Sequence, residues 1–148
     1  MTKAIQNVSL KKLKSIMLID DNEVDNFINQ KILESCGATN ILTFESTTDA
    51  LNYLKQTVEA PQLILLDRYL PIMNGFEFMD ELEKLEIVKQ PINVFILSAS
   101  INPQDIKMAL EKKCTGYIKK PLTTEKILKL LETINNDKTK TSSTLKTN

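Results

Sequence analysis

Short apolar runs alternate with helix-period segments along most of this chain, and this alternation restricts the fold more than any other feature. The runs read "SIMLID", "NILTF", "QLILLD", "INVFILSAS" and "CTGYIKKP", at residues 15–20, 40–44, 62–67, 92–100 and 114–121. In the segments after these runs, apolar residues recur at helical spacing. Five strands alternating with five helices predict a doubly wound α/β domain whose parallel sheet is covered on both faces.

Capping residues mark the expected helix ends. They are Asp21 or Asn22 with Gly37 at the far end, Ser46 with Asp49, Asn102 with Pro103, and Thr123. Four of the five expected helices carry an apolar stripe, which we expect to face the core. The stripes are Val24, Phe27, Ile28 and Ile32; Ala50, Leu51 and Leu54; Phe78, Met79, Leu82 and Leu85; and Ile127, Leu130, Leu131 and Ile134.

The length of 148 residues suits one domain with a sizeable core. Hydrophobic residues make up 42% and charged residues 26%, which is ordinary for a globular protein. No apolar run approaches the roughly 20 residues that a membrane span needs, and the first residues lack the pattern of a secretion signal. We expect a cytoplasmic protein with one domain at residues 14–136 and flexible basic segments at 1–13 and 137–148.

The formal net charge of zero hides an uneven distribution of charge. Residues 1–14 carry four lysines and no acid, and residues 137–148 carry three lysines and one acid. Residues 15–136 are left with 12 basic and 18 acidic residues, a balance of −6. Such a balance argues against nucleic-acid binding by the domain.

The chain contains no histidine, which excludes Ser-His-Asp and Cys-His catalysis and any metal site built on imidazole. Its two cysteines, Cys36 and Cys114, are too few and too scattered for a disulfide framework or a zinc site. A metal in this protein would therefore be a hard cation with oxygen ligands, such as magnesium.

Polar residues stand where the expected strands end: Asp20 and Asp21, Asp67, Ser98, and Lys119-Lys120-Pro121. In open α/β sheets the ligand site lies at the carboxyl ends of the strands. Three carboxylates packed together repel unless a cation joins them, and magnesium bound there would prefer a phosphoryl group as a further ligand. A lysine and a hydroxyl can stabilise such a group, and an aspartate can accept it covalently. The pattern predicts phosphoryl transfer onto a carboxylate.

Each element also has an ordinary structural explanation. An Asp-Asp pair after a strand is commonly a helix cap, a strand-terminal aspartate commonly forms a turn, and Lys-Lys-Pro is commonly surface charge. The combination, in this order at successive strand ends, favours the functional interpretation.

The sequence resembles the receiver domain of two-component response regulators over about residues 14 to 136. The resemblance rests on "LIDDNEVDNF", "LLDRYLPIMNGFEF", "ILSAS" and "GYIKKPL". It implies a flavodoxin-like (βα)5 fold with strand order 2-1-3-4-5. It also implies a magnesium-dependent phosphoprotein of signal transduction, whose partners are a sensor histidine kinase or a histidine phosphotransfer protein and a downstream protein.

The resemblance assigns roles to particular residues. Asp67 would be the phosphoacceptor, Asp21 a direct magnesium ligand, and Asp20 a ligand acting largely through a water or hydrogen bond. The backbone carbonyl of Tyr69 would complete the protein's ligands. Lys120 would pair with the phosphoryl group or Asp67; its neighbour Lys119 should point to the other face of the strand. Ser98 would be the switch hydroxyl, Tyr117 the switch aromatic, and Pro71 and Gly75 the turn after the acceptor.

Three residues depart from the family pattern. Arg68 and Tyr69 are bulkier than expected just after the acceptor, and Asn74 stands where an aspartate is common. Tyr69 could flank the mouth of the site and alter access of phosphodonors or water, which leaves the lifetime of the phosphorylated state open.

The expected function is a receiver that switches a docking surface or relays the phosphoryl group, and catalyses only its own phosphoryl acceptance and loss. A phosphatase-like hydrolase of similar architecture is disfavoured, because it wants a second acid where Tyr69 stands. A receiver-like interaction module that does not use phosphate is the main alternative. A homodimer through the fourth-helix to fifth-helix face is left open.

Overall fold

The computed structural model describes residues 10–85 and 91–139, with side chains described up to residue 136. Its five strands form one parallel sheet in the order β2-β1-β3-β4-β5, which confirms the predicted topology. The strands are β1 (Ile16–Ile19), β2 (Ile41–Phe44), β3 (Leu63–Asp67), β4 (Asn93–Ser98) and β5 (Gly116–Lys119). The helices are α2 (Glu23–Ser35), α3 (Thr47–Gln56), α4 (Gly75–Glu83), α5 (Pro103–Glu111) and α6 (Thr124–Thr139), preceded by a short 3-10 helix η1 (Leu10–Lys12).

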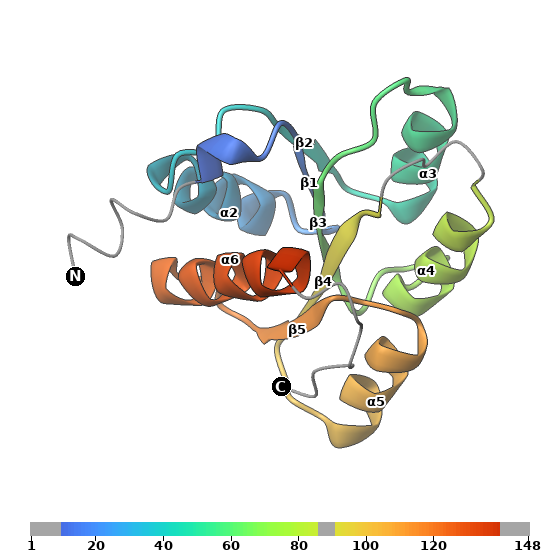
Figure 1. The fold of residues 1–148 in the computed structure, drawn as a ribbon. Helices are drawn as coiled ribbons and strands as arrows, with labels where there is room; N and C mark the ends of the chain where they lie inside the picture. Colours follow the sequence, from blue (N-terminus) through green and yellow to red (C-terminus); the bar gives the residue numbers. More distant parts are fainter. Residues whose placement is uncertain (1–9, 86–90, 140–148) are drawn as a thin grey trace.

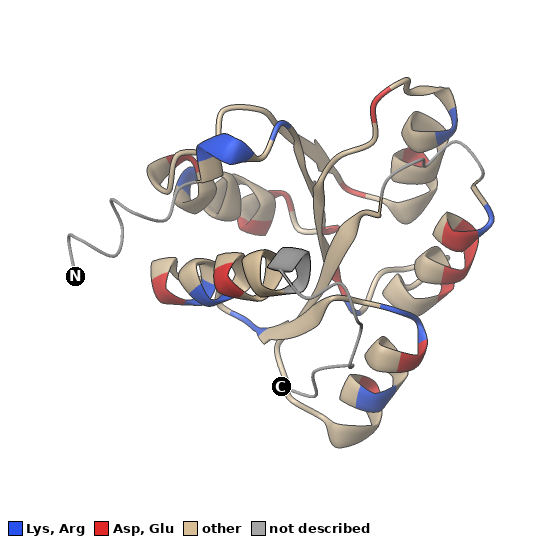
Figure 2. Ribbon diagram, viewed as in Figure 1, with Lys and Arg blue, Asp and Glu red and all other residues tan. Residues whose placement is uncertain are grey.

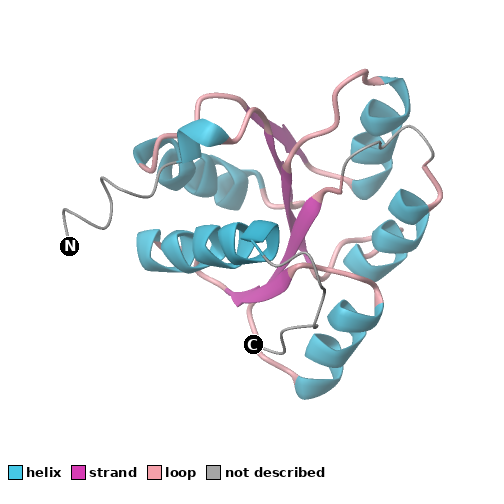
Figure 3. Cartoon of the chain, in the orientation of Figure 1, coloured by secondary structure: helices cyan, strands magenta, loops and turns pink. Residues whose placement is uncertain are grey.

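The helices cover both faces of the sheet (Figures 1 and 3). Helices α2 and α6 lie on one face, and α3, α4 and α5 lie on the other. Alternate residues of the central strands therefore serve two cores: Ile16 and Leu18 belong to the α2/α6 side, whereas Met17 and Ile19 belong to the other side. Figure 2 shows that charged residues lie mainly on helices, loops and strand ends.

Most of the expected caps are present. The side chains of Asn22, Ser46, Asn102 and Thr123 each accept a hydrogen bond from a backbone N–H in the first turn of the helix that follows. These bonds satisfy donors that have no partner within the helix, at about 1 kcal/mol each. Helix α4 has a capping box of Asn74 and Glu77 that was not predicted from the sequence.

The predicted core-facing stripe of α2 is wrong in three of its four positions. Val24, Phe27 and Ile28 are 63%, 60% and 49% exposed. The helix instead buries Asn26, Asn29 and Leu33. The physical reason is that the amide of Asn26 hydrogen-bonds to strand-end carbonyls, which turns a polar face of the helix toward the sheet.

The domain boundaries also differ from the prediction. Leu10 and Leu13, expected in a flexible segment at 1–13, are buried in the α2/α6 core, so the packed domain begins before residue 14. Helix α6 continues to Thr139, beyond the expected boundary at 136. The remaining parts of both predicted tails lie outside the described residues.

Candidate functional site

The ends of β1 and β3 bring three carboxylates together. The register pairs Ile19 with Leu66, so the next residues, Asp20 and Asp67, lie side by side. Asp20 and Asp67 are buried and Asp21 is exposed, and each of the three offers an oxygen within 4.8 Å of the others'. The sequence therefore predicted correctly that the strand-end acids converge.

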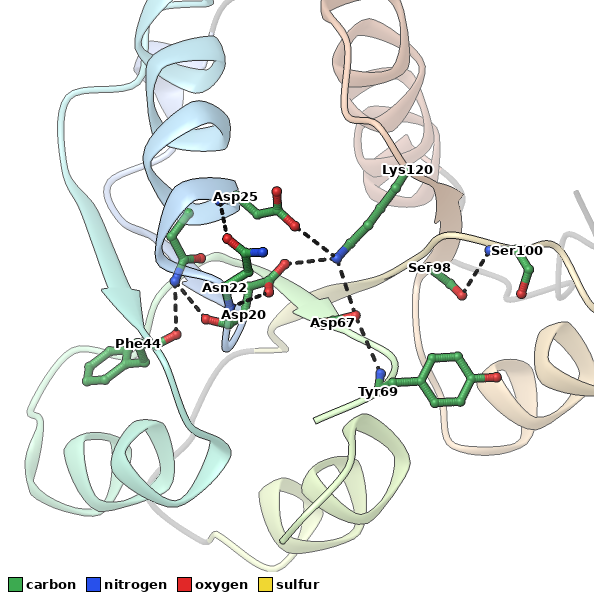
Figure 4. A network of polar contacts seen from close by, with 10 residues as sticks. Asp20, Asn22, Asp25, Phe44, Asp67, Tyr69, Ser98, Ser100 and Lys120 are labelled. Atoms are coloured by element: carbon green, nitrogen blue, oxygen red, sulfur yellow. Dashed lines mark hydrogen bonds and ion pairs between the residues drawn. The ribbon is translucent and has the colours of Figure 1, made fainter. Parts of the chain in front are cut away.

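Lys120 enters this cluster from the end of β5. Its Nζ donates to Asp20 Oδ2 at 2.9 Å and lies 3.5 Å from Asp67 Oδ1 and 3.7 Å from Asp25 Oδ2 (Figure 4). The backbone N–H of Lys120 donates to the Ser98 carbonyl at 2.7 Å, which anchors the chain to β4. Lys119 is exposed and lines a different groove. Of the two adjacent lysines, Lys120 is the one that reaches the acids.

Charge in the cluster is poorly balanced around Asp67. Burial and the charge of Asp20 raise the pKa of Asp67 to about 6, against the lowering effect of Lys120 and of the Tyr69 N–H. For the Lys120 ammonium, burial would lower the pKa, but the bond to Asp20 and the charges of Asp67, Asp20 and Asp25 outweigh it and raise the pKa. One lysine is insufficient compensation for these carboxylates, so the site favours a further cation.

The donor set fits a small hard divalent cation. Its oxygens are carboxylates from Asp20, Asp21 and Asp67. Magnesium prefers such oxygen ligands and typically keeps several waters, so the exposed position of Asp21 is compatible with it.

Two residues that were not predicted as site residues from the sequence, Asn26 and Asp25, also support the site. Asn26 Nδ2 donates to the carbonyls of Asp20 at 2.8 Å and Phe44 at 3.4 Å, which ties α2 to the ends of β1 and β2. Asp25 adds a third acid near Lys120, after Asp20 and Asp67. The position of Asp25 in the first turn of α2, directly after the acid pair, was a signal that could have indicated it.

The turn after Asp67 closes tightly over the end of β3. The Tyr69 N–H donates to Asp67 Oδ1 at 3.4 Å, and the Gly75 N–H donates to the Arg68 carbonyl at 3.2 Å. A Cβ on Gly75 would lie 2.8 Å from the backbone oxygen of Asp67, so a side chain would force this turn apart. A close backbone approach therefore explains the glycine at this position. Pro71 is exposed in the same turn.

Ser98 is the last residue of β4, and Tyr117 lies on the neighbouring strand β5. Ser98 is fully buried, and its Oγ accepts a long hydrogen bond of 3.4 Å from the Ser100 N–H. The Tyr117 ring is half-buried, and its hydroxyl donates to the Ser100 carbonyl at 3.3 Å. Burial raises the pKa of the Tyr117 phenol. Both predicted switch residues therefore contact the segment after β4.

The sequence model of the family described as "Response regulator receiver domain" matches residues 16–132. The chain belongs to the response regulator receiver family. This assignment agrees with the four quoted motifs and with the fold, and it confirms the resemblance inferred from the sequence. Receiver domains generally bind Mg²⁺ at an acidic cluster such as the one at Asp20, Asp21 and Asp67.

Curated relatives of this receiver domain include proteins of two-component signalling. It is 27% identical to the two-component response regulator ORR1 of Oryza sativa subsp. japonica over 122 residues, which cover 78% of this chain and 52% of the relative. It is 33% identical to hybrid signal transduction histidine kinase C of Dictyostelium discoideum over 111 residues, 72% of this chain and 9% of that protein. The chain spans about half the length of the first curated relatives it matches.

Solved structures give the same assignment. A two-component response regulator from Cytophaga hutchinsonii superimposes with a TM-score of 0.77 at 29% identity, covering 85% of this chain and 99% of that one. A response regulator receiver protein from Dyadobacter fermentans gives a TM-score of 0.69 at 32% identity, covering 80% and 94%. Within the described part of the chain, every helix is too short or too polar to span a membrane.

Proposed function

We propose that this receiver domain accepts a phosphoryl group on Asp67 from a phosphohistidine of a partner protein, in a magnesium-dependent reaction. The observation that carries the proposal is the strand-end cluster: a buried Asp67 with Asp20 and Asp21 beside it and Lys120 at 3.5 Å. Because the pKa of Asp67 is raised only to about 6, its carboxyl is largely ionised at neutral pH and can act as a nucleophile.

In the proposed reaction an oxygen of Asp67 attacks the phosphorus, and the phosphorus–nitrogen bond of the phosphohistidine breaks. The imidazole leaves with that electron pair and takes up a proton, and Asp67 becomes an acyl phosphate. Asp20, Asp21, Asp67 and the Tyr69 carbonyl would hold Mg²⁺, which would neutralise charge on the phosphoryl oxygens. The chain would catalyse only its own phosphoryl acceptance and loss, and it could pass the group on to a further protein in a relay.

Lys120 and Ser98 would respond to the new charge. Lys120 would exchange one of its carboxylate partners for a phosphoryl oxygen, since it already contacts Asp20 and Asp67. The Ser98 hydroxyl would move toward the phosphoryl group and release the Ser100 N–H. Tyr117 would then give up its bond to Ser100 and turn inward, which would bias a two-state equilibrium of the surrounding surface.

The surface around Tyr117 supports docking of a downstream protein. A groove between β5 and α6 is lined by apolar and basic side chains, including Ile101, Tyr117, Lys126 and Leu130. Tyr117 belongs both to this groove and to the proposed switch, so a movement of its ring would alter the groove.

The exposed apolar side chains of α2 support docking of the phosphohistidine partner at a second surface. Val24, Phe27 and Ile28 follow directly after the acid pair, and apolar side chains clustered on one helix face are typical of protein contacts. A partner bound to this face would stand next to the mouth of the site, which lies at the start of α2 (Figure 4).

Beryllofluoride, which mimics a phosphoryl group, tests the proposal without any partner. We expect beryllofluoride with Mg²⁺ to change the amide NMR spectrum of the wild type around Asp67, Ser98 and Tyr117. Asp67→Asn should show no such change. Asp80→Asn is the matched control, since Asp80 is an acid on α4 that pairs with Lys112 away from the cluster, and it should respond like the wild type. A wild type that does not respond would favour the phosphate-independent interaction module.

A further inference from the structure

Asp105 joins the segment after the acceptor to the first turn of α5. Its Oδ1 lies 3.5 Å from Arg68 Nη2, and its Oδ2 accepts a hydrogen bond of 3.2 Å from the Tyr69 hydroxyl. Both oxygens of one carboxylate are thus used by two consecutive residues, 37 and 36 positions earlier in the chain. These residues, Arg68 and Tyr69, are two of the three that depart from the family pattern.

The Asp105 carboxylate compensates the charge of the Arg68 guanidinium. It stacks between the rings of Tyr69 and Phe76, with its central carbon 4.6 Å and 4.2 Å from the ring centroids. The side chains of Arg68 and Asp105 are only 16% and 13% exposed, so water screens their attraction poorly. Arg68 Nε is buried without a hydrogen-bond partner among the described residues. Asp105 therefore supplies the compensating charge in this part of the structure.

The same segment contacts Asp67 through its backbone. The Arg68 N–H donates to the Leu97 carbonyl at 2.9 Å, and the Tyr69 N–H donates to Asp67 Oδ1 at 3.4 Å. Because Asp105 contacts the side chains of both residues, it is placed to restrain the Tyr69 N–H that bonds Asp67. The Tyr69 side chain extends from this segment toward the region of Ser98 and Ser100 (Figure 4).

We infer that Asp105 is a positioning residue for the Asp67 site, which acts through Arg68 and Tyr69 to hold the Tyr69 peptide groups in place for Mg²⁺. The inference rests on the proposed function, because it uses the Tyr69 carbonyl as a metal ligand. Asp105 contacts neither Asp67 nor the other acids of the cluster in the described contacts.

Mg²⁺ alone tests this role, with amide NMR shifts as the measure of binding. We expect Asp105→Ala to weaken Mg²⁺ binding by about three- to ten-fold, since removal of an outer partner of a metal ligand has effects of this order or larger. Asp105→Asn keeps a hydrogen-bond acceptor for the Tyr69 hydroxyl and should lose less Mg²⁺ affinity. Tyr69→Phe removes only the hydrogen bond and should also lose less than Asp105→Ala. Asp80→Asn breaks an ion pair between α4 and the other end of α5, and it should bind Mg²⁺ as the wild type does.

Amide hydrogen exchange gives a second readout that needs no ligand. Asp105→Ala should speed exchange of the Arg68 and Tyr69 amides while exchange in β1 and β3 stays unchanged, which separates a local role from a general loss of stability. The inference is overturned if Asp105→Ala exchanges these amides and binds Mg²⁺ as Asp80→Asn does. If the wild type takes no phosphoryl group or mimic, the proposed function fails, and the exchange rates still decide whether Asp105 positions the segment.

Discussion

The Asp67 carboxyl carries opposed demands at the scale of a single residue. It is buried beside Asp20, which favours its neutral form, and it is also 3.5 Å from Lys120, which favours its charged form. The first effect wins, because the pKa of Asp67 is raised from 3.8 to about 6. Above that pH the folded protein therefore carries the cost of an ionised carboxylate that the unfolded chain keeps in water.

Replacing this carboxylate should stabilise the protein. The folded-state pKa lies above the unfolded value, so the folded state binds more protons between pH 3.8 and about 6, and stability from this group falls as the pH rises through that window. Without Mg²⁺ at pH 7.5, we expect Asp67→Asn to raise the free energy of unfolding by about 1–2 kcal/mol, below the full shift because the site is partly open to water. Below about pH 4 the difference should disappear. Urea unfolding followed by circular dichroism measures both values.

Mg²⁺ provides the control for this prediction. A cation that binds the folded cluster stabilises the wild type by mass action, so added Mg²⁺ should narrow the gap between the wild type and Asp67→Asn. If Asp67→Asn is no more stable than the wild type at pH 7.5 without Mg²⁺, the electrostatic account of the site is contradicted.

At the scale of an element, the two faces of α2 carry different kinds of side chain. Its inward face carries Leu33 for the core and Asn26 for the strand-end carbonyls. Its outward face carries Val24, Phe27 and Ile28, beside the mouth of the site. The helix therefore helps to position Asp20, and under the proposed function its exposed apolar face would meet the partner.

Substitutions on the two faces of α2 should have different effects. Leu33→Ala should lower the free energy of unfolding by about 2–5 kcal/mol, because it leaves a cavity in the α2/α6 core. Phe27→Ala should change the free energy of unfolding by no more than about 0.5 kcal/mol, because Phe27 is 60% exposed. Urea unfolding of the two variants measures the difference. An equal loss of stability in the two variants would show that Phe27 faces the core, as the sequence predicted.

Phosphotransfer kinetics test the outward face separately. Phe27→Ala should accept a phosphoryl group from phosphoramidate at the wild-type rate, yet react more slowly with a phosphohistidine protein. Equal loss with both donors would assign Phe27 to the chemistry rather than to docking.

The comparison of prediction with structure is clearest at this scale. The strands were predictable because both faces of a parallel sheet are buried, so "LILL" at 63–66 is apolar throughout. The orientation of α2 was not, because a stripe counts apolar residues and cannot register that Asn26 gains hydrogen bonds by facing inward. The role of Asp105 was equally hidden, since its partners lie more than thirty positions away and no local pattern links them.

At the scale of the whole molecule, the sheet assembles the site from distant parts of the chain. Asp20 and Lys120 are 100 positions apart, and they meet because β1 and β5 end at the same edge of a parallel sheet. The convergence of the acids and the lysine was predictable from topology alone. The assembly is common to the receiver family to which the chain belongs, whereas the contacts of Arg68 and Tyr69 with Asp105 arise from residues that depart from its pattern.

The most direct test of this account is intact mass spectrometry after incubation with acetyl phosphate or phosphoramidate, with and without Mg²⁺. We expect the wild type to gain the mass of one phosphoryl group only when Mg²⁺ is present, and Asp67→Asn to gain none. Asp80→Asn, matched in charge change, should gain the group as the wild type does. Labelling of Asp67→Asn to the same extent as the wild type would contradict the assignment of Asp67 as the acceptor. Labelling of the wild type that does not depend on Mg²⁺ would contradict the proposed role of the metal.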